Sequence, residues 1–197
     1  EFEDLIYQNV KLAGTPATED TVTPVGIQQG TGVKIGATQR IMNQGSLQNT
    51  GVDTDVAIVG EGFFRVQQYD GSYAYTRDGS FKIDSNGQLV NSNGLRVMPE
   101  IIMPENFEIN TLTISNDGRV SVKVAGNDDP LDIGQLEIYR FANPAGLTSE
   151  GANLFTVSNA SGEAMATRPG LDGAGTTKQR FLEASNVSVV NEMVQMI

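Results

Sequence analysis

The sequence predicts a mainly β protein: a single β-rich domain of hairpins with an extended N-terminal connector and a short C-terminal helical stub. Three observations lead to this prediction. Short apolar runs and alternating segments fill the chain from residue 56 onward, which is typical of strands. Tight-turn dipeptides recur between these segments, because Asp-Gly and Asn-Gly pairs tolerate positive φ; they begin at Asp70, Asp78, Asn86, Asn93 and Asp117. Near the two ends of the chain, apolar residues instead recur at spacings of three and four, which is typical of one face of a helix.

The first 35 residues are predicted to form a helix followed by an extended connector. From Glu1 to Gly14 the acidic first turn and the closing glycine suit a helix, and four apolar residues share one face. These residues are Phe2, Leu5, Ile6 and Val10. From Thr15 to Gly36 the composition changes to Thr, Pro, Gly and Gln, and the two prolines oppose a helix. This second stretch therefore reads as a connector.

Residues 36–180 are predicted to form the β-rich core domain. Its clearest strands are Val56–Val59, Phe63–Val66, Val120–Val124, Leu136–Phe141 and Leu154–Val157, with a looser alternation over Phe107–Ile114. We expect Asp78-Gly79 to close a hairpin and Arg77 to make an ion pair at the surface. This explains the charges between two aromatic residues without invoking an active site.

Residues 181–197 are predicted to begin a C-terminal helix. The apolar residues after Ser185 fall on one helical stripe: Val187, Val190, Val194 and Ile197, with Met193 beside them. A short amphipathic helix is marginal in water by itself. Its apolar face, like that of Leu5 and Ile6, therefore either covers the core of the domain or binds neighbouring subunits. The pattern alone leaves both interpretations open.

Composition narrows the range of chemistry. The chain has no Cys and no His, which removes disulfides, thiolate sites, and the commonest general base and transition-metal ligand. Its net charge of −11 disfavours nucleic acid and anionic membranes as partners. No apolar run is long enough for membrane insertion, and no signal-like leader opens the chain. We expect no cofactor, no metal site, no catalytic residue and no enzyme activity.

The remaining motifs are weak. The glycines of Gly30–Gly36 miss the dinucleotide-binding spacing by one residue and lack a preceding strand. Asp84–Gly87 and Asn127–Pro130 contain fragments of calcium loops without the closing Glu. Paired carboxylates of a glycosidase can be imagined at Asp53 and Asp55 or at Glu61 and Asp78, but acidic residues are abundant here. Connectors and turns explain these stretches better.

Several blocks, taken in chain order, resemble the shared signature of bacterial flagellar rod and hook proteins. They are Gln44–Leu47, Asp55–Ile58, Gly60–Phe64, Tyr75–Gly79, Phe141–Leu147, Gly151–Phe155, Leu182–Val187 and Glu192–Ile197. Within that family, residues 2–36 are most similar to the connector of the distal-rod members. The hook and proximal-rod members are the alternatives. The family also has long terminal helices, so the resemblance implies a core fragment that lacks them.

The resemblance implies a mechanical function, as a structural subunit of the basal-body rod that transmits torque from motor to hook. It implies as partners copies of the chain in a helical tube, hook and proximal-rod proteins, bushing rings and the export apparatus. It places the protein in the flagellar basal body of the cell envelope, exported by a type III apparatus without a cleaved signal peptide. Under it, the terminal apolar residues become subunit contacts: Leu5, Ile6, Tyr7, Val187, Val190, Met193, Val194 and Ile197.

One alternative comes from a different class. A secreted β-rich module could bind carbohydrate by stacking sugars on exposed tyrosine rings, for which the sequence offers Tyr7, Tyr69, Tyr73 and Tyr75. Exposed rings beside a polar hollow would favour this alternative, whereas buried rings would count against it.

Overall fold

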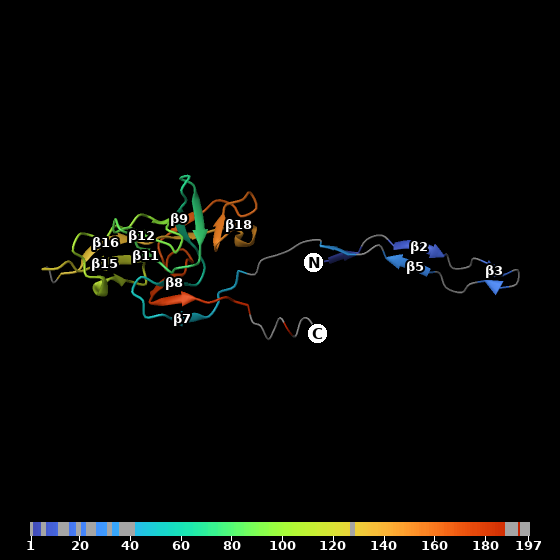
Figure 1. Cartoon of the computed structure of the whole chain (residues 1–197), viewed down its shortest axis with the longest axis horizontal. Helices are drawn as coiled ribbons and strands as arrows, with labels where there is room; N and C mark the ends of the chain where they lie inside the picture. The colour runs from blue at the N-terminus through green and yellow to red at the C-terminus, as the bar shows by residue number, and fades with distance from the viewer. Residues whose placement is uncertain are drawn as a thin grey trace. The chain divides into compact units, whose positions relative to one another are not determined.

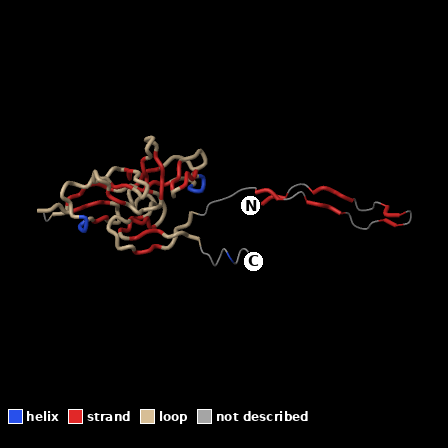
Figure 2. Tube along the Cα trace, viewed as in Figure 1, coloured by secondary structure: helices blue, strands red, loops and turns tan. Residues whose placement is uncertain are grey.

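The computed structural model describes residues 42–126, 129–187 and 193, together with the strand residues of the first 41 positions. The chain divides into two compact units, Glu1–Ile41 and Met42–Ile197 (Figure 1). The boundary expected at residue 36 falls in a stretch, 36–41, that lies outside the described residues. Strands dominate both units, which confirms the mainly β prediction (Figure 2).

The first unit is built from nested antiparallel strand pairs. Its strands are β1 (Phe2–Asp4), β2 (Tyr7–Lys11), β3 (Pro16–Thr18), β4 (Thr21–Val22), β5 (Ile27–Gly30) and β6 (Val33–Ile35). β1 pairs with β6, β2 with β5, and β3 with β4. Each pair therefore lies inside the previous one, as in a single long hairpin.

The helix predicted over Glu1–Gly14 is wrong, because β1 and β2 occupy that stretch. A helix of about this length is marginal in water without a packing partner. The strands β5 and β6, which contain the β-branched residues Ile27, Val33 and Ile35, provide instead partners with which the backbone can pair. The connector expected after residue 14 is extended, but its described residues are paired strands: β3 pairs with β4, while β5 and β6 pair with the preceding segment.

A seven-stranded antiparallel sheet is the centre of the second unit, in the order β11-β12-β13-β9-β10-β19-β18. Its strands are β9 (Phe64–Gln67), β10 (Tyr73–Thr76), β11 (Lys82–Ile83), β12 (Leu89–Val90), β13 (Arg96–Met98), β18 (Thr148–Gly151) and β19 (Leu154–Thr156). The hairpins β9–β10 and β18–β19 meet where Tyr75 pairs with Phe155. Segments about 80 residues apart in sequence are thus joined in one sheet.

Shorter sheets complete the second unit. One contains β14 (Thr113–Ile114), β15 (Arg119–Val122) and β16 (Leu131–Gln135); the two-stranded pairs are β17 (Ile138–Arg140) with β20 (Met165–Thr167), β8 (Val56–Val59) with β21 (Thr176–Gln179), and β7 (Leu47–Asn49) with β22 (Phe181–Glu183). Two short 3-10 turns, η1 (Ile109–Thr111) and η2 (Pro144–Gly146), lie between strands. No helix among the described residues is long and apolar enough to cross a membrane.

The buried residues form two apolar clusters, with the neighbours Phe63 and Phe64 in different ones. Phe64 and Val66 are fully buried in the larger cluster, which includes Ile58, Phe81, Leu89, Val97, Leu136 and Ile138. A smaller aromatic cluster contains Phe63, Tyr75, Tyr139, Phe141 and Leu147. Tyr75 and Phe141 pack edge to face with ring centroids 4.9 Å apart. Burial of each such side chain stabilises the fold by about 1.5–3 kcal/mol.

The turn at Asp78-Gly79 differs from the prediction. Glycines of the other four turn dipeptides have positive φ, as tight turns require: Gly71, Gly87, Gly94 and Gly118. Gly79 does not close a hairpin, since β10 pairs with β9 and β19 while β11 pairs with β12. A Cβ on Gly79 would lie 1.7 Å from the carbonyl oxygen of Val56. Glycine is needed here for close backbone approach.

The other expected strands have mixed outcomes. Those predicted at Val56–Val59, Phe63–Val66, Leu136–Phe141 and Leu154–Val157 contain β8, β9, β17 and β19. Val120–Val124 forms β15 as far as Val122, whereas Phe107–Ile114 contains η1 and the two-residue β14. The C-terminal helical stub is not confirmed: Met193 is helical, and residues 188–192 and 194–197 lie outside the described residues.

Candidate functional site

The two chain segments that enter and leave the β domain run together through what we call the neck, residues 43–49 and 181–187. Within it β7 pairs with β22, from Leu47 opposite Glu183 to Asn49 opposite Phe181. The pairing extends outward, since the backbone N–H of Ala184 donates to the oxygen of Ser46 at 2.8 Å. Figure 1 shows β7 beside the C-terminal ribbon. The neck is therefore a two-stranded stem.

Arg77 and Glu183 form a largely buried ion pair at this stem, with side chains 18% and 11% exposed. Nε and Nη2 of Arg77 donate to Oε2 of Glu183 at 2.9 and 2.6 Å. Nη1 donates to the carbonyl oxygens of Gly60 and Gly62 at 3.1 and 2.9 Å. The expectation of a surface pair for Arg77 is wrong, because the guanidinium is enclosed by the turn between β8 and β9.

Backbone groups of the entering segment complete this network. Oε1 of Glu183 accepts the N–H of Gly45 at 2.8 Å. The side chain of Gln44 donates to the carbonyl of Ile58 and accepts the N–H of Gly60, each at 3.0 Å. A Cβ on Gly45 would lie 1.8 Å from the carbonyl oxygen of Ala184, so the strands meet closely there. No local pattern in the sequence predicts this network, because Arg77 and Glu183 are 106 residues apart.

A second cluster stacks Arg65 between two tyrosine rings. Its guanidinium carbon lies 4.5 Å from the ring centre of Tyr73 and 4.4 Å from that of Tyr139. The hydroxyl of Tyr139 donates to Glu137 at 2.6 Å. Burial, followed by this hydrogen bond to Glu137, raises the pKa of Tyr139 well above its usual range. Burial also raises the pKa of Tyr75. Both phenols are held neutral over the physiological pH range.

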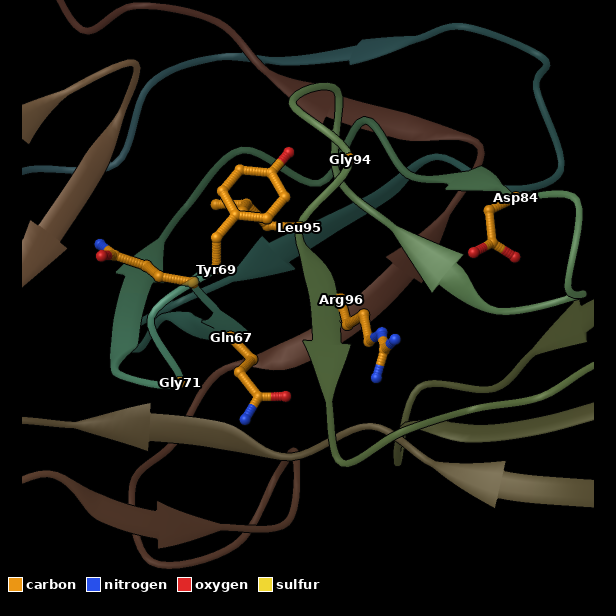
Figure 3. Close-up of a pocket in the computed structure, with 8 residues that line it drawn as sticks. Gln67, Tyr69, Gly71, Asp84, Gly94, Leu95 and Arg96 are labelled. Atoms are coloured by element: carbon orange, nitrogen blue, oxygen red, sulfur yellow. The ribbon is translucent and has the colours of Figure 1, made fainter.

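A polar pocket of about 390 Å³ lies beside the β9–β10 turn (Figure 3), lined by Gln67, Gln68, Tyr69, Gly71, Asp84, Gly94, Leu95 and Arg96. The hydroxyl of Tyr69 donates to the carbonyl of Asn93 at 3.0 Å, and its side chain is 86% exposed. Tyr75 is buried and Tyr73 is stacked on Arg65. Among the tyrosines whose side chains the structure describes, Tyr69 therefore fits the stacking role of the carbohydrate alternative best.

The acidic residues considered for catalysis are engaged in structural contacts. Glu61 pairs with Arg140 at 3.1 Å, and Asp53 pairs with Arg180 at 2.6 Å. Asp55 accepts a hydrogen bond from Thr50 at 2.6 Å, and Asp78 caps the backbone of Ser80. No group of three or more potential metal ligands occurs in the described part of the chain.

Most residues predicted to contact other subunits cannot be placed. Val187 and Met193 are described, and both are exposed, at 61% and 56%. Tyr7 begins β2, opposite Gly30. Five of the predicted contacts lie outside the described residues: Leu5, Ile6, Val190, Val194 and Ile197.

Comparison with known proteins gives consistent similarities. A family model described as the flagellar hook protein FlgE/F/G D1 domain matches residues 57–122. A second, described as the flagellar basal body rod FlgEFG protein C-terminal region, matches residues 178–197. Both matches include blocks that resemble rod and hook proteins, such as Tyr75–Gly79 and Leu182–Val187.

Individual relatives agree with the family models. The flagellar basal-body rod protein FlgG of Borreliella burgdorferi is 55% identical over 197 residues, which is 100% of this chain and 74% of the relative. The FlgG of Buchnera aphidicola (subspecies Schizaphis graminum) is 50% identical over 196 residues, 100% of this chain and 75% of the relative. The flagellar hook protein FlgE of Helicobacter mustelae is 39% identical over 94 residues, 47% of this chain and 21% of the relative.

Proposed function

The chain belongs to the family of FlgG flagellar basal-body rod proteins, and on this premise we propose that it is a building block of the distal rod. The observation that carries the proposal is 55% identity to a rod protein over the whole chain. The similarity to a hook protein covers less than half of the chain, which favours the rod over the hook alternative.

The proposed mechanism is mechanical. Many copies stack helically by repeated heterologous contacts, as in any open filament, and torque from the motor passes through these contacts to the hook. A continuous buried core supports this proposal, because close-packed interiors transmit strain. The structural engagement of the candidate carboxylates also favours a load-carrying over a catalytic function.

The proposed partners are copies of the chain, hook and proximal-rod proteins, the surrounding bushing rings and the export apparatus, all within the basal body of the cell envelope. The exposed apolar side chains of Val187 and Met193 support the terminal segments as subunit contacts. The same role is proposed for Leu5, Ile6, Tyr7, Val190, Val194 and Ile197.

Gene replacement tests this function. In the flagellated bacterium that encodes this protein, deletion of the gene should leave basal bodies without a distal rod, hook or filament. Restoring the wild-type gene should restore all three in electron micrographs of isolated basal bodies. Complete rods in the deletion strain would overturn the proposal.

A further inference from the structure

The neck links the β domain to both ends of the chain, yet its own strand pairing is too short to hold it in place. Unit Glu1–Ile41 precedes it and residues 188–197 follow it, so any force between the β domain and either end of the chain passes through it. Its β7–β22 ladder spans only three residue pairs. A two-stranded ladder of this length is marginal by itself. Other contacts must hold the stem against the domain.

The Arg77–Glu183 network provides such contacts from several parts of the fold. The guanidinium is joined to the carboxylate of β22 and to two carbonyls of the β8–β9 turn. The same carboxylate binds the N–H of Gly45 on the entering segment. Gln44 adds two bonds from that segment, one to Ile58 of β8 and one to Gly60 of the β8–β9 turn. One charged pair thus connects both strands of the stem to the body of the domain.

Hydrogen bonds to charged groups can fix the direction of the stem in a way that apolar contacts cannot. Apolar burial is non-directional, whereas charge-assisted hydrogen bonds are short and fix geometry. Neither hydrophobic cluster contains Gln44, Arg77 or Glu183. Partial burial also shields the pair from salt screening. The network is therefore suited to fixing the direction of the stem.

We propose that Arg77, Glu183 and Gln44 form a latch that holds the neck at a fixed angle to the β domain, so that torque passes through the chain without bending it there. They are positioning residues of the rod, and this proposal rests on the proposed function. Arg77 carries most of the latch, because its charged guanidinium bridges two carbonyls of the β8–β9 turn and the carboxylate of Glu183 in the stem.

Amide hydrogen exchange tests the latch directly. In Arg77→Ala, exchange of residues 43–49 and 181–187 should accelerate by about tenfold or more, while the amides of β9, β10 and β12 keep their protection. Glu183→Gln retains the size of the side chain and should give a smaller effect in the same segments. Glu183→Gln also serves as the second variant if Arg77→Ala accelerates amide exchange throughout the whole domain. Unchanged neck exchange in both variants would overturn the latch.

Arg180→Ala is the matched control, because Arg180 binds Asp53 at 2.6 Å but is 54% exposed and does not join the stem to the β8–β9 turn. In this control variant, the amides of the neck should exchange at least tenfold more slowly than they do in Arg77→Ala. Equal loosening in the control would show that any lost arginine pair has this effect, and would overturn the assignment to Arg77.

Rod shape tests the mechanical role. In cells, the full-length protein with Arg77→Ala should form rods that bend, or that fail under viscous load, while Arg180→Ala gives straight rods. A loosened neck together with straight rods and normal swimming at high viscosity would overturn the positioning role. Failure of the wild-type gene to restore rods would instead overturn the proposed function, so the two failures are distinguishable.

Discussion

At the scale of single residues, the two buried tyrosines Tyr75 and Tyr139 make the stability of the fold depend on pH in the alkaline range. The raised pKa of Tyr139 arises from burial and from the hydrogen bond to Glu137, so the neutral phenol is favoured in the folded state. A raised folded-state pKa contributes stability that is fully present below the unfolded value and is lost as pH rises through the folded one.

We therefore expect the free energy of unfolding to fall as pH rises above about 10, the ordinary tyrosine value. Urea unfolding between neutral and alkaline pH measures this fall, and the ultraviolet absorbance of tyrosinate should show Tyr75 and Tyr139 titrating late. Tyr139→Phe should reduce the slope above this pH. Titration of all tyrosines in one step near the ordinary value would contradict the prediction.

Glycine at position 79 allows a second test. Gly79→Ala should lower the free energy of unfolding by about 3 kcal/mol or more, because the new Cβ would overlap the backbone of Val56 and force a shift of the strand. Gly71→Ala is the control: nothing lies within 4 Å of its Cβ, and only its φ of +86° is strained, at about 1–2 kcal/mol. Denaturant unfolding measures both. Equal losses would show that packing at Gly79 is unimportant.

Side-chain partners were the least predictable feature at this scale. The sequence places Arg77 beside a turn dipeptide, which suggested a surface position. Its burial depends on Glu183, which comes 106 residues later. A pairing across such a separation has no local sequence signal, whereas the positive φ of Gly71 or Gly94 follows from the dipeptide itself.

At the scale of elements, predictions succeeded where the signal was local. The alternation and apolar runs around β8, β9 and β19 were sufficient to predict strands. The segment Glu1–Gly14 has a helical apolar spacing, yet its structure is decided by the partner strands β5 and β6. Periodicity alone could not distinguish the two outcomes.

The nested hairpin of the first unit leads to a prediction for the assembled rod. Deleting residues 15–29 removes β3, β4 and most of β5, which leaves β2 without its partner. If this unit braces neighbouring copies, full-length protein with the deletion should give curved or flexible rods in electron micrographs. Rods that stay straight would remove the bracing role.

The C-terminal stripe leads to another prediction. Val190→Asp with Val194→Asp in the full-length protein should abolish rod growth, because burying each valine in a subunit contact would contribute about 1.5–3 kcal/mol and an unpaired carboxylate there adds a desolvation cost. The same pair in the 197-residue chain should leave the melting temperature nearly unchanged. A melting temperature lowered by many degrees would instead place the stripe in the interior of the domain.

At the scale of the whole molecule, charge governs association between copies. The net charge of −11 opposes close approach at neutral pH and low salt, while the isoelectric point is near 4.3. We expect light scattering to report the mass of one chain at neutral pH and low salt, and growing association as the pH falls toward the isoelectric point. Added salt should have the same direction of effect, because it screens exposed charges beyond about 10 Å at 0.1 M.

The fold class and the family were both predictable from the sequence, but for different reasons. The fold class follows from strand and turn patterns, whereas the family follows from ordered blocks such as Tyr75–Gly79 and Leu182–Val187. The order of strands in the seven-stranded sheet was not predictable, because β13 joins β9 and β10 joins β19 across long loops. The neck depends on that same long-range topology.

The nesting of the first unit also bears on how such a protein changes its length over generations. Phe2 lies opposite Ile35, so the outermost paired residues of its strands are neighbours, about 5 Å apart at the Cα atoms. Genetic insertions or losses between them need not displace the flanking chain, provided that they occur in matched numbers on both strands. A single added codon would shift one strand relative to the other, whereas a paired change adds one rung. The strand pairs of this unit can therefore become longer or shorter by matched insertions or deletions, without changes in the rest of the protein.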